Sequence, residues 1–108
     1  MKHAGALAGL GVPGKNTLLV NERFGNMIWL GAVLVSTDLG PDLIAPYEVR
    51  TAKCTLCMDS CPHHALDGIT IDQRLCRQRS ISYSYGGGWV LSCDICRKAC
   101  PYHENLTK

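Results

Sequence analysis

Seven cysteines are the residues of this chain whose type and spacing could do chemistry. They all lie between residues 54 and 100 of a 108-residue chain. Six of them form two triplets of the pattern C-x2-C-x3-C-P, at residues 54–62 and 93–101, and Cys76 lies between the triplets. Thiolates are soft ligands that suit iron–sulfur clusters and zinc. The repeated ligand pattern predicts two metal centres.

Iron–sulfur clusters are the centres that this spacing favours. In a C-x2-C-x2-C-x3-C-P run, three cysteines hold one cluster and the fourth reaches the other cluster. The same crossed rule divides these cysteines into one complete set of four and one incomplete set of three. The complete set is Cys61, Cys76, Cys93 and Cys96, and the incomplete set is Cys54, Cys57 and Cys100.

The incomplete set leaves one ligand position open near Thr51, three residues before Cys54. Three thiolates could hold a 3Fe-4S cluster or a 4Fe-4S cluster with one exchangeable iron. A third alternative is a 4Fe-4S cluster completed by an oxygen ligand, another chain or a substrate.

Zinc is the main alternative metal, because C-x2-C pairs also form zinc knuckles. However, both groups here are triplets ending in Cys-Pro, and seven cysteines do not divide into fours without a histidine. We interpret His63 and His64, directly after Pro62, as solvated or packing side chains. The odd number of cysteines also argues against a closed set of disulfides, and we expect a reducing cytoplasm.

The composition predicts a folded chain with a thin apolar core. The sequence has one Phe, two Trp and four Tyr, but eleven Gly and five Pro. Bound clusters would add the stability that so small a core lacks. A formal net charge of +2 is too small to indicate a dedicated nucleic-acid patch. The longest apolar run, Met27 to Val35, is too short to span a bilayer, so we expect no membrane association.

The elements that position the cysteines change in character near residue 47. Residues 1–46 contain no cysteine and predict a fragment of a larger α/β unit. We expect in it a short helix, a turn at Pro13-Gly14, and strands at 17–20 and 27–35.

Residues 47–108 predict a ferredoxin-type iron–sulfur domain. We expect helices at 62–66 and 72–79, the second capped by Asp72, and a short strand at 69–71. The glycine-rich YSYGGG stretch predicts a loop, followed by a helix-like segment from 89 to 100. The predicted fold class is α+β: a two-cluster ferredoxin-like module preceded by the α/β fragment.

Gly9, Gly11 and Gly14 spell G-x-G-x-x-G, and Lys15 follows as in a phosphate-binding loop. The match fails because Asn16 stands where a magnesium-binding Ser or Thr is needed. We therefore interpret this segment as a glycine turn that allows close approach of the backbone to neighbouring chain or to a bulky cofactor.

Four segments together resemble the epoxyqueuosine reductase family: AGLGVPGKNTLLVNERFGNMIWLGAVLVSTDL, CTLCMDSCPHHAL, IDQRLCR and GGWVLSCDICRKACP. Members of this family reduce the epoxide of a modified tRNA nucleoside with cobalamin, and two 4Fe-4S clusters supply the electrons. The resemblance implies that the seven cysteines are cluster ligands. It also implies cobalamin near residues of the glycine-rich segment, namely Gly9, Gly11, Gly14, Lys15 and Asn16.

The resemblance further implies an electron donor such as a ferredoxin or flavodoxin, and a tRNA substrate. Family members are longer, and their cobalamin-binding half with its acidic proton donor lies upstream. We therefore expect this chain to be a C-terminal portion truncated at its N-terminus, with another chain supplying the missing half. The alternatives are a stand-alone ferredoxin-like electron carrier and a zinc-stabilised interaction module. No catalytic residue can be assigned from the sequence.

Overall fold

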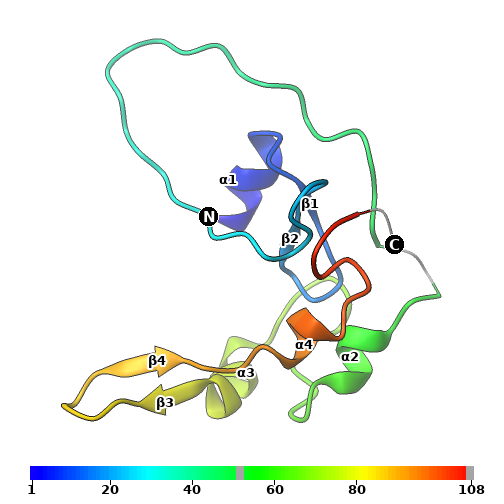
Figure 1. The fold of residues 1–108 in the computed structure, drawn as a ribbon, viewed down its shortest axis with the longest axis vertical. Coiled ribbons are helices and arrows are strands. Elements are labelled where there is room, and N and C mark those ends of the chain that lie inside the picture. Colours follow the sequence, from blue (N-terminus) through cyan, green and yellow to red (C-terminus); the bar gives the residue numbers. More distant parts are fainter. Residues whose placement is uncertain (51–52, 107–108) are drawn as a thin grey trace.

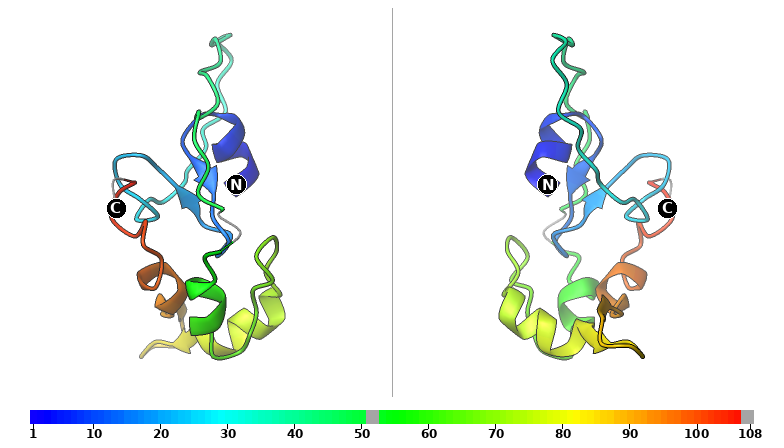
Figure 2. Two further views of the ribbon diagram at one scale, coloured as in Figure 1. Left: turned by 90° about the vertical axis from the view of Figure 1, so that its right-hand side faces the viewer. Right: turned by 90° about the vertical axis from the view of Figure 1, so that its left-hand side faces the viewer.

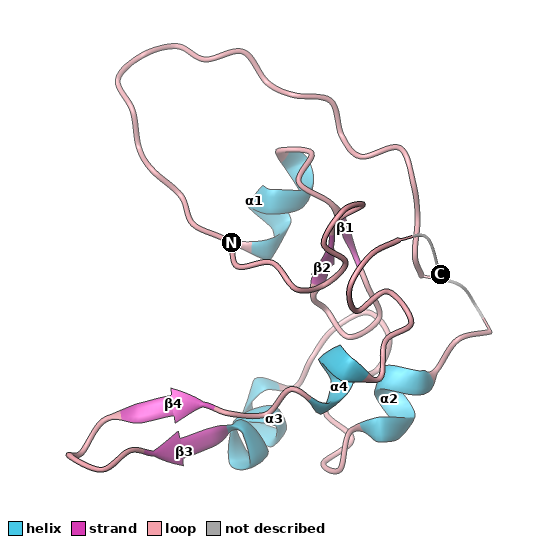
Figure 3. Ribbon diagram, viewed as in Figure 1, coloured by secondary structure: helices cyan, strands magenta, loops and turns pink. Residues whose placement is uncertain are grey.

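The computed structural model describes residues 1–50 and 53–106. It combines short helices with two separate two-stranded antiparallel sheets, as Figures 1 and 3 show. The predicted mixture of helices and strands is confirmed. The predicted division into two domains at residues 46 and 47 stays a prediction.

The N-terminal part consists of helix α1 (Lys2–Leu7) and a small hairpin of β1 (Val12–Pro13) and β2 (Leu19–Val20). The hairpin turn is closed by hydrogen bonds between Gly14 and Leu18 and between Thr17 and Gly14. Helix α1 confirms the predicted short helix. The predicted strand at 17–20 forms only in its second half, because Thr17 has a left-handed φ of 63° within the turn.

The second predicted strand, Met27 to Val35, is wrong. Residues 28–46 contain no helix or strand and make no hydrogen bond to other described residues. In Figure 1 they form the long arc drawn in cyan to green. Trp29 is 91% exposed and Leu34 is fully exposed, although their residue types favour strands. A strand needs a partner for its backbone, and no described segment pairs with this one.

The cysteine-rich part contains helices α2 (Leu56–Ser60), α3 (Gln73–Ser80) and α4 (Ile95–Lys98). The predicted helix at 62–66 is wrong, because the helix of this motif precedes the proline. Cys61 has an extended backbone with ψ of 114°, as expected directly before Pro62. The predicted strand at 69–71 is reduced to a single bridge between Leu66 and Ile71.

Helix α3 matches its prediction, since the Asp72 side chain accepts hydrogen bonds from the backbone N–H groups of Arg74 and Leu75. After α3 the chain forms a hairpin of β3 (Ile81–Tyr83) and β4 (Trp89–Leu91). The sequence predicted a loop and then a helix here. Only the glycine turn of that loop is present, with Gly86 and Gly87 at positive φ, and the helix is confined to α4.

The two parts meet along the C-terminal segment. Figure 2 shows this segment, in red, returning beside β1 and β2 after α4. The backbone N–H of Asn26 donates to the carbonyl of Tyr102 at 3.0 Å, and Leu106 donates to Glu22 at 3.2 Å. The core is small, with Val20 fully buried beside Leu19. No described helix is long and apolar enough to cross a membrane.

Candidate functional site

The seven cysteines gather around two cavities, each with contributions from both cysteine motifs. The first, which we call the four-cysteine cavity, is lined by Cys61, Cys76, Cys93 and Cys96. The second, the three-cysteine cavity, is lined by Cys54, Cys57 and Cys100. These are the two groups that the crossed rule predicted to act as ligand sets. The structure places them together; their role as ligands stays a prediction.

The crossing follows from the packing of α2 against α4. Cys57 lies within α2 and Cys61 directly after it, so one turn separates the two thiols along the chain. Cys96 and Cys100 occupy the equivalent positions around α4. Because the two helices pack side by side, the last cysteine of each motif reaches the cavity of the other motif.

Cys76 comes from α3 rather than from either motif. The Asp72 cap fixes the start of this helix, and Cys76 lies one turn later. The Cys76 thiol is 3.9 Å from the Ser80 hydroxyl oxygen, to which it donates, and Ser80 is buried. The hydrogen-bonded ends of α3 therefore hold this thiol at the four-cysteine cavity.

The four-cysteine cavity is mostly enclosed by apolar residues, including Leu66, Ile71 and Ile95. Burial raises the pKa of Cys96 to about 11, and the neighbouring thiols of Cys93 and Cys76 add to the shift. A buried thiol surrounded by other thiols resists ionisation unless a cation neutralises the resulting charge. Without a neutralising cation, the thiol of Cys96 therefore stays protonated at neutral pH.

In the three-cysteine cavity, burial likewise raises the pKa values of the thiols. Burial raises the pKa of Cys57, with the thiols of Cys100 and Cys54 as further causes. The pKa of Cys100 is also raised by burial, while hydrogen bonds from the backbone N–H of Tyr102 and from the Asn26 side chain act in the opposite direction.

The glycine-rich segment contacts the cysteine loops directly. Lys15 and Asn16 both line the three-cysteine cavity. The Lys15 ammonium donates to the Cys54 carbonyl at 2.7 Å, and the Asn16 amide donates to the Cys96 carbonyl at 3.1 Å. Asn16 is 2% exposed. The sequence left two interpretations of this segment open, close approach to neighbouring chain or to a bulky cofactor. The contacts of Lys15 and Asn16 show the first, close approach to neighbouring chain.

The glycines of this segment also lie close to neighbouring parts of the chain. A Cβ atom at Gly11 would collide with the backbone of Val20, and one at Gly9 with the carbonyl of Leu43. Gly14 lines the three-cysteine cavity beside Lys15. Proximity of this segment to cobalamin stays a prediction.

The histidines occupy different environments. His63 lines the four-cysteine cavity, and His103 contacts Asn26. Within residues 1–50 and 53–106, no three His, Cys, Asp or Glu side chains converge closely enough to hold a single metal ion. The thiols are therefore spread around the cavity walls. Thr51, the predicted open position, lies outside the described residues.

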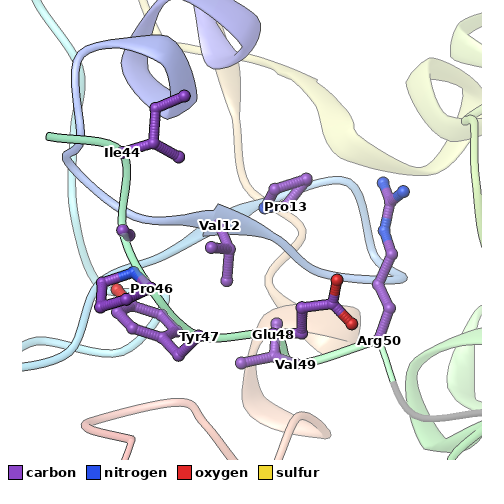
Figure 4. Close-up of a pocket in the computed structure, with 9 residues that line it drawn as sticks. Val12, Pro13, Ile44, Pro46, Tyr47, Glu48, Val49 and Arg50 are labelled. Atoms are coloured by element: carbon purple, nitrogen blue, oxygen red, sulfur yellow. The ribbon is translucent and has the colours of Figure 1, made fainter.

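A third cavity of about 560 Å³ lies between β1 and residues 44–50 (Figure 4). Its lining is largely apolar, with Val12, Tyr47 and Val49, and it contains no cysteine. The Tyr47 hydroxyl donates to the Val20 carbonyl at 3.1 Å, and so ties this segment to β2. The cavity is separate from both groups of thiols.

Sequence reasoning missed two residues near the thiols. Asn26 is not among the predicted site residues, yet it is 1% exposed and bonds to residues more than 70 positions away. Lys2 is exposed and donates to the Thr17 hydroxyl at 3.1 Å. Desolvation lowers the pKa of its ammonium group, and the neighbouring Cys76 and Cys96 act in the opposite direction. No local pattern signals either contact, because both depend on tertiary packing.

Comparisons with known proteins find epoxyqueuosine reductases among the relatives of this chain. No protein-family model matches the chain. An epoxyqueuosine reductase from Lactococcus garvieae is 36% identical over 114 residues, which cover 94% of this chain and 31% of that protein. Another, from Aliivibrio fischeri, is 36% identical over 112 residues and covers 90% of this chain and 29% of the relative.

The fold is similar to solved structures of proteins with the same name. The epoxyqueuosine reductase of Streptococcus thermophilus superimposes with a TM-score of 0.72 at 26% identity, covering 98% of this chain and 32% of that one. The chain thus spans about a third of the length of the relatives that it matches. The predicted resemblance is confirmed: over nearly its whole length, this chain is similar in sequence and in fold to part of an epoxyqueuosine reductase.

Proposed function

We propose that this chain is an iron–sulfur electron-transfer module of an epoxyqueuosine reductase-like oxidoreductase. One 4Fe-4S cluster would bind in the four-cysteine cavity, and a 4Fe-4S or 3Fe-4S cluster in the three-cysteine cavity. The observation that carries the proposal is the crossed grouping of the thiols. Cys61 lines a cavity with Cys93 and Cys96 of the other motif, while Cys100 lines the cavity of Cys54 and Cys57.

The residues present fit such clusters. The donors are all thiols, which iron–sulfur clusters prefer, and they come from several directions around each cavity. A backbone N–H group supports one of these sulfurs, since that of Ala65 donates to the Cys61 sulfur at 3.5 Å. Bound clusters would supply one-electron transfer, which side chains alone cannot provide.

The charge balance supports the same proposal. The Lys15 ammonium lies at the three-cysteine cavity, and Lys2 lies near Cys76 and Cys96. A cubane with four thiolates carries about two negative charges when oxidised, so nearby ammonium groups stabilise it. One lysine of the N-terminal part therefore lies at the three-cysteine cavity, and a second lies in the neighbourhood of the four-cysteine cavity without lining it.

The name of the relatives supports the proposed substrate, and the resemblance to their family supports the remaining cofactor. We propose reduction of an epoxide in tRNA queuosine modification, with cobalamin as the reactive cofactor and a ferredoxin or flavodoxin as electron donor. A further chain segment would supply the cobalamin-binding half. Any approach of a corrinoid to Gly9, Gly11 and Gly14 would have to preserve the bonds of Lys15 and Asn16 to the cysteine loops.

Metal analysis tests the proposal most directly. We expect about eight iron atoms and matching acid-labile sulfide per chain after anaerobic purification, or about seven if one cluster is a 3Fe-4S cluster. Electron paramagnetic resonance of oxidised and reduced samples distinguishes these two results. Zinc without sulfide would refute the proposal and favour an interaction module.

Single cysteine variants test the crossed grouping. We expect Cys61→Ser to remove the same spectroscopic signal as Cys93→Ser, although Cys61 belongs to the first motif. We expect Cys100→Ser to remove the same signal as Cys54→Ser. Tyr85→Phe in the exposed hairpin turn serves as a control and should retain both signals. If each motif instead controls its own signal, the crossed arrangement is wrong.

A stand-alone electron carrier is the second candidate function. It would use the same two cavities and the same seven cysteines. Cobalamin distinguishes the two functions. A change in the cobalamin absorption spectrum on adding the reduced protein would support the reductase module, whereas reduction of other acceptors without any cobalamin interaction would support the carrier.

A further inference from the structure

The β3–β4 hairpin carries aromatic side chains that lie in solvent. Tyr83 is 84% exposed, Trp89 is 66% exposed, and Tyr85 at the turn is fully exposed. Figure 1 shows the hairpin extending away from the rest of the chain, on the far side of α3 from α2 and α4. Tyrosine and tryptophan contribute most when their rings are covered, in a core or in an interface. Their exposure here indicates a surface that binds a partner.

The register of the hairpin places two of these rings side by side. Tyr83 and Trp89 lie directly opposite each other on the two strands. The next pair towards the turn is hydrogen-bonded, because the Ser84 N–H donates to the Gly88 carbonyl at 2.7 Å. Tyr83 and Trp89 therefore form a non-hydrogen-bonded pair, in which the facing side chains stand closest together. One face of the hairpin thus presents a pair of adjacent rings to solvent.

Helix α3, which leads directly into β3, has two different faces. Cys76 and Arg79 line the four-cysteine cavity on one face. Arg74 and Arg77 are three positions apart, so they share the opposite face, and both are exposed. Arg77 donates to the Gln73 side chain at 2.9 Å, and a guanidinium has further N–H groups that remain for a ligand. Two guanidinium groups are therefore carried by the helix that ends at the base of the hairpin.

The charge of this part of the chain has a single sign. Residues 73–93 contain three arginines and no Asp or Glu, although the net charge of the whole chain is only +2. Guanidinium groups bind phosphate through paired hydrogen bonds, and unpaired bases stack on aromatic side chains. A purely apolar partner would leave the arginines without a ligand, and a small anion would leave the rings uncovered. Single-stranded nucleic acid satisfies both groups.

We propose that the β3–β4 hairpin and the outer face of α3 bind unpaired nucleotides of an RNA loop. Bases stack on Tyr83 and Trp89, and phosphates are bound by Arg74 and Arg77. We call these four residues the hairpin surface. The inference rests on the proposed function for the identity of the RNA, a tRNA. None of the four residues lines either thiol cavity, so the surface can be altered without removing a predicted cluster ligand.

Fluorescence anisotropy of the anaerobically purified protein tests the role of the rings. The probes are a labelled RNA stem–loop and a blunt RNA duplex of the same stem, and we expect the stem–loop to bind more tightly. Tyr83→Ala and Trp89→Ala should each weaken its binding by roughly five- to 100-fold, the usual effect of losing one stacked base. Tyr83→Phe keeps the ring and should retain binding. The iron content of each variant shows whether it is folded.

The salt dependence of binding tests the role of the arginines. Arg74→Gln and Arg77→Gln should each weaken binding and reduce the slope of log affinity against log salt concentration by about 0.7, because each removes one phosphate contact. Arg23→Gln is the matched control for charge, since Arg23 lies in the N-terminal part, 5.1 Å from the centre of the Phe24 ring. Trp29→Ala is the control for exposed aromatic area. Both controls should bind the stem–loop as the unmodified protein does.

Four results would overturn the inference: no binding of the stem–loop by the unmodified protein, equally tight binding of the duplex, unchanged binding in both alanine variants, or equal losses in the two controls. Light scattering identifies a competing occupant. Self-association that Trp89→Ala abolishes, in protein that does not bind the stem–loop, would mean that a second copy covers the hairpin. Absence of iron and sulfide from the unmodified protein would overturn the proposed function, whereas the results above in protein with both clusters would overturn this inference alone.

Discussion

The Lys15 ammonium group lies 2.7 Å from the main-chain carbonyl oxygen of Cys54, 39 residues further along the chain. The same side chain lines the three-cysteine cavity. A single residue of the glycine-rich segment therefore anchors the start of the first cysteine motif and places positive charge beside its thiols. The phosphate-loop appearance of this segment has a different physical basis: its lysine binds a backbone carbonyl of the protein itself.

Lys15→Met should destabilise the protein by about 1.5–3 kcal/mol, the usual contribution of a hydrogen bond from a charged group. The partly buried Cys54 carbonyl would lose its donor, and the cavity would lose a positive charge. Urea unfolding of the anaerobically purified protein measures the free energy. Lys53→Met, at an exposed residue next to Cys54, is the control and should change it little. Equal losses in the two variants would contradict the role of the Lys15 contact.

Asp72→Ala should destabilise the protein by about 1 kcal/mol, because α3 would lose the side chain that accepts from Arg74 and Leu75. Asp72→Asn should retain most of the stability, since asparagine is an equally good helix cap. Thermal unfolding with iron content measured in parallel is the assay. The prediction fails if both substitutions have the same effect.

The features that sequence reasoning predicted are those set by local chemistry. The Asp72 cap needs only an acceptor before a helix, and the grouping of the cysteines follows from their spacing around two helices. The cap signal is contained in a few consecutive residues, whereas the cysteine grouping was predicted from a repeated ligand pattern and is brought about by the packing of α2 against α4.

The features that sequence reasoning did not predict depend on partners far away along the chain. Met27 to Val35 has the composition of a strand, but pairing requires another segment that the local sequence does not specify. The β3–β4 hairpin escaped prediction because its strands are only three residues long on each side of a glycine turn. Asn26 could not be identified because its partners, residues 97–103, are more than 70 positions away.

Asp67 should make stability depend on pH. Hydrogen bonds from the backbone N–H groups of Thr70 and Ile69 hold the pKa of its carboxyl below the usual value of 3.8. A carboxyl whose pKa is lower in the folded state stabilises the fold above its unfolded pKa, and this stabilisation is lost as the pH falls through the folded pKa. The contribution should therefore be complete at pH 6 to 7 and decline below about pH 4.

Asp67→Asn tests this dependence by thermal unfolding between pH 7 and pH 3, with metal content followed at each pH. We expect the variant to be less stable than the unmodified protein at neutral pH, and the difference to shrink in acid. Asp42→Asn, in the exposed segment 28–46, is the control and should show no such trend. A difference that stays constant down to pH 3 would contradict the prediction.

Gly25→Ala should destabilise the protein strongly, by more than about 1 kcal/mol. Gly25 has a left-handed φ of 56°, and a Cβ atom there would collide with the carbonyls of Tyr102 and His103. The substitution would push the C-terminal segment away from β2. Gly31→Ala is the matched control, because a Cβ atom at Gly31 meets nothing within 4 Å. Urea unfolding should separate the two variants clearly, and similar midpoints would show that the contact at Gly25 is dispensable.

In limited proteolysis, the segment 28–46 should be cleaved earlier than the β3–β4 hairpin. Trp29 and Tyr85 are both highly exposed aromatic residues that chymotrypsin can recognise. However, the turn around Tyr85 is closed by hydrogen bonds between Ser84 and both Gly87 and Gly88, whereas residues 28–46 have none to other described residues. A segment without such bonds opens at lower free energy and fits a protease more readily. Mass spectrometry of the first fragments should identify cleavage after Trp29, Leu34 or Leu43. First cleavage at Tyr83 or Tyr85 would contradict the prediction and would mean that residues 28–46 are covered in solution. Light scattering at the same protein concentration would then test whether a second copy of the chain covers them.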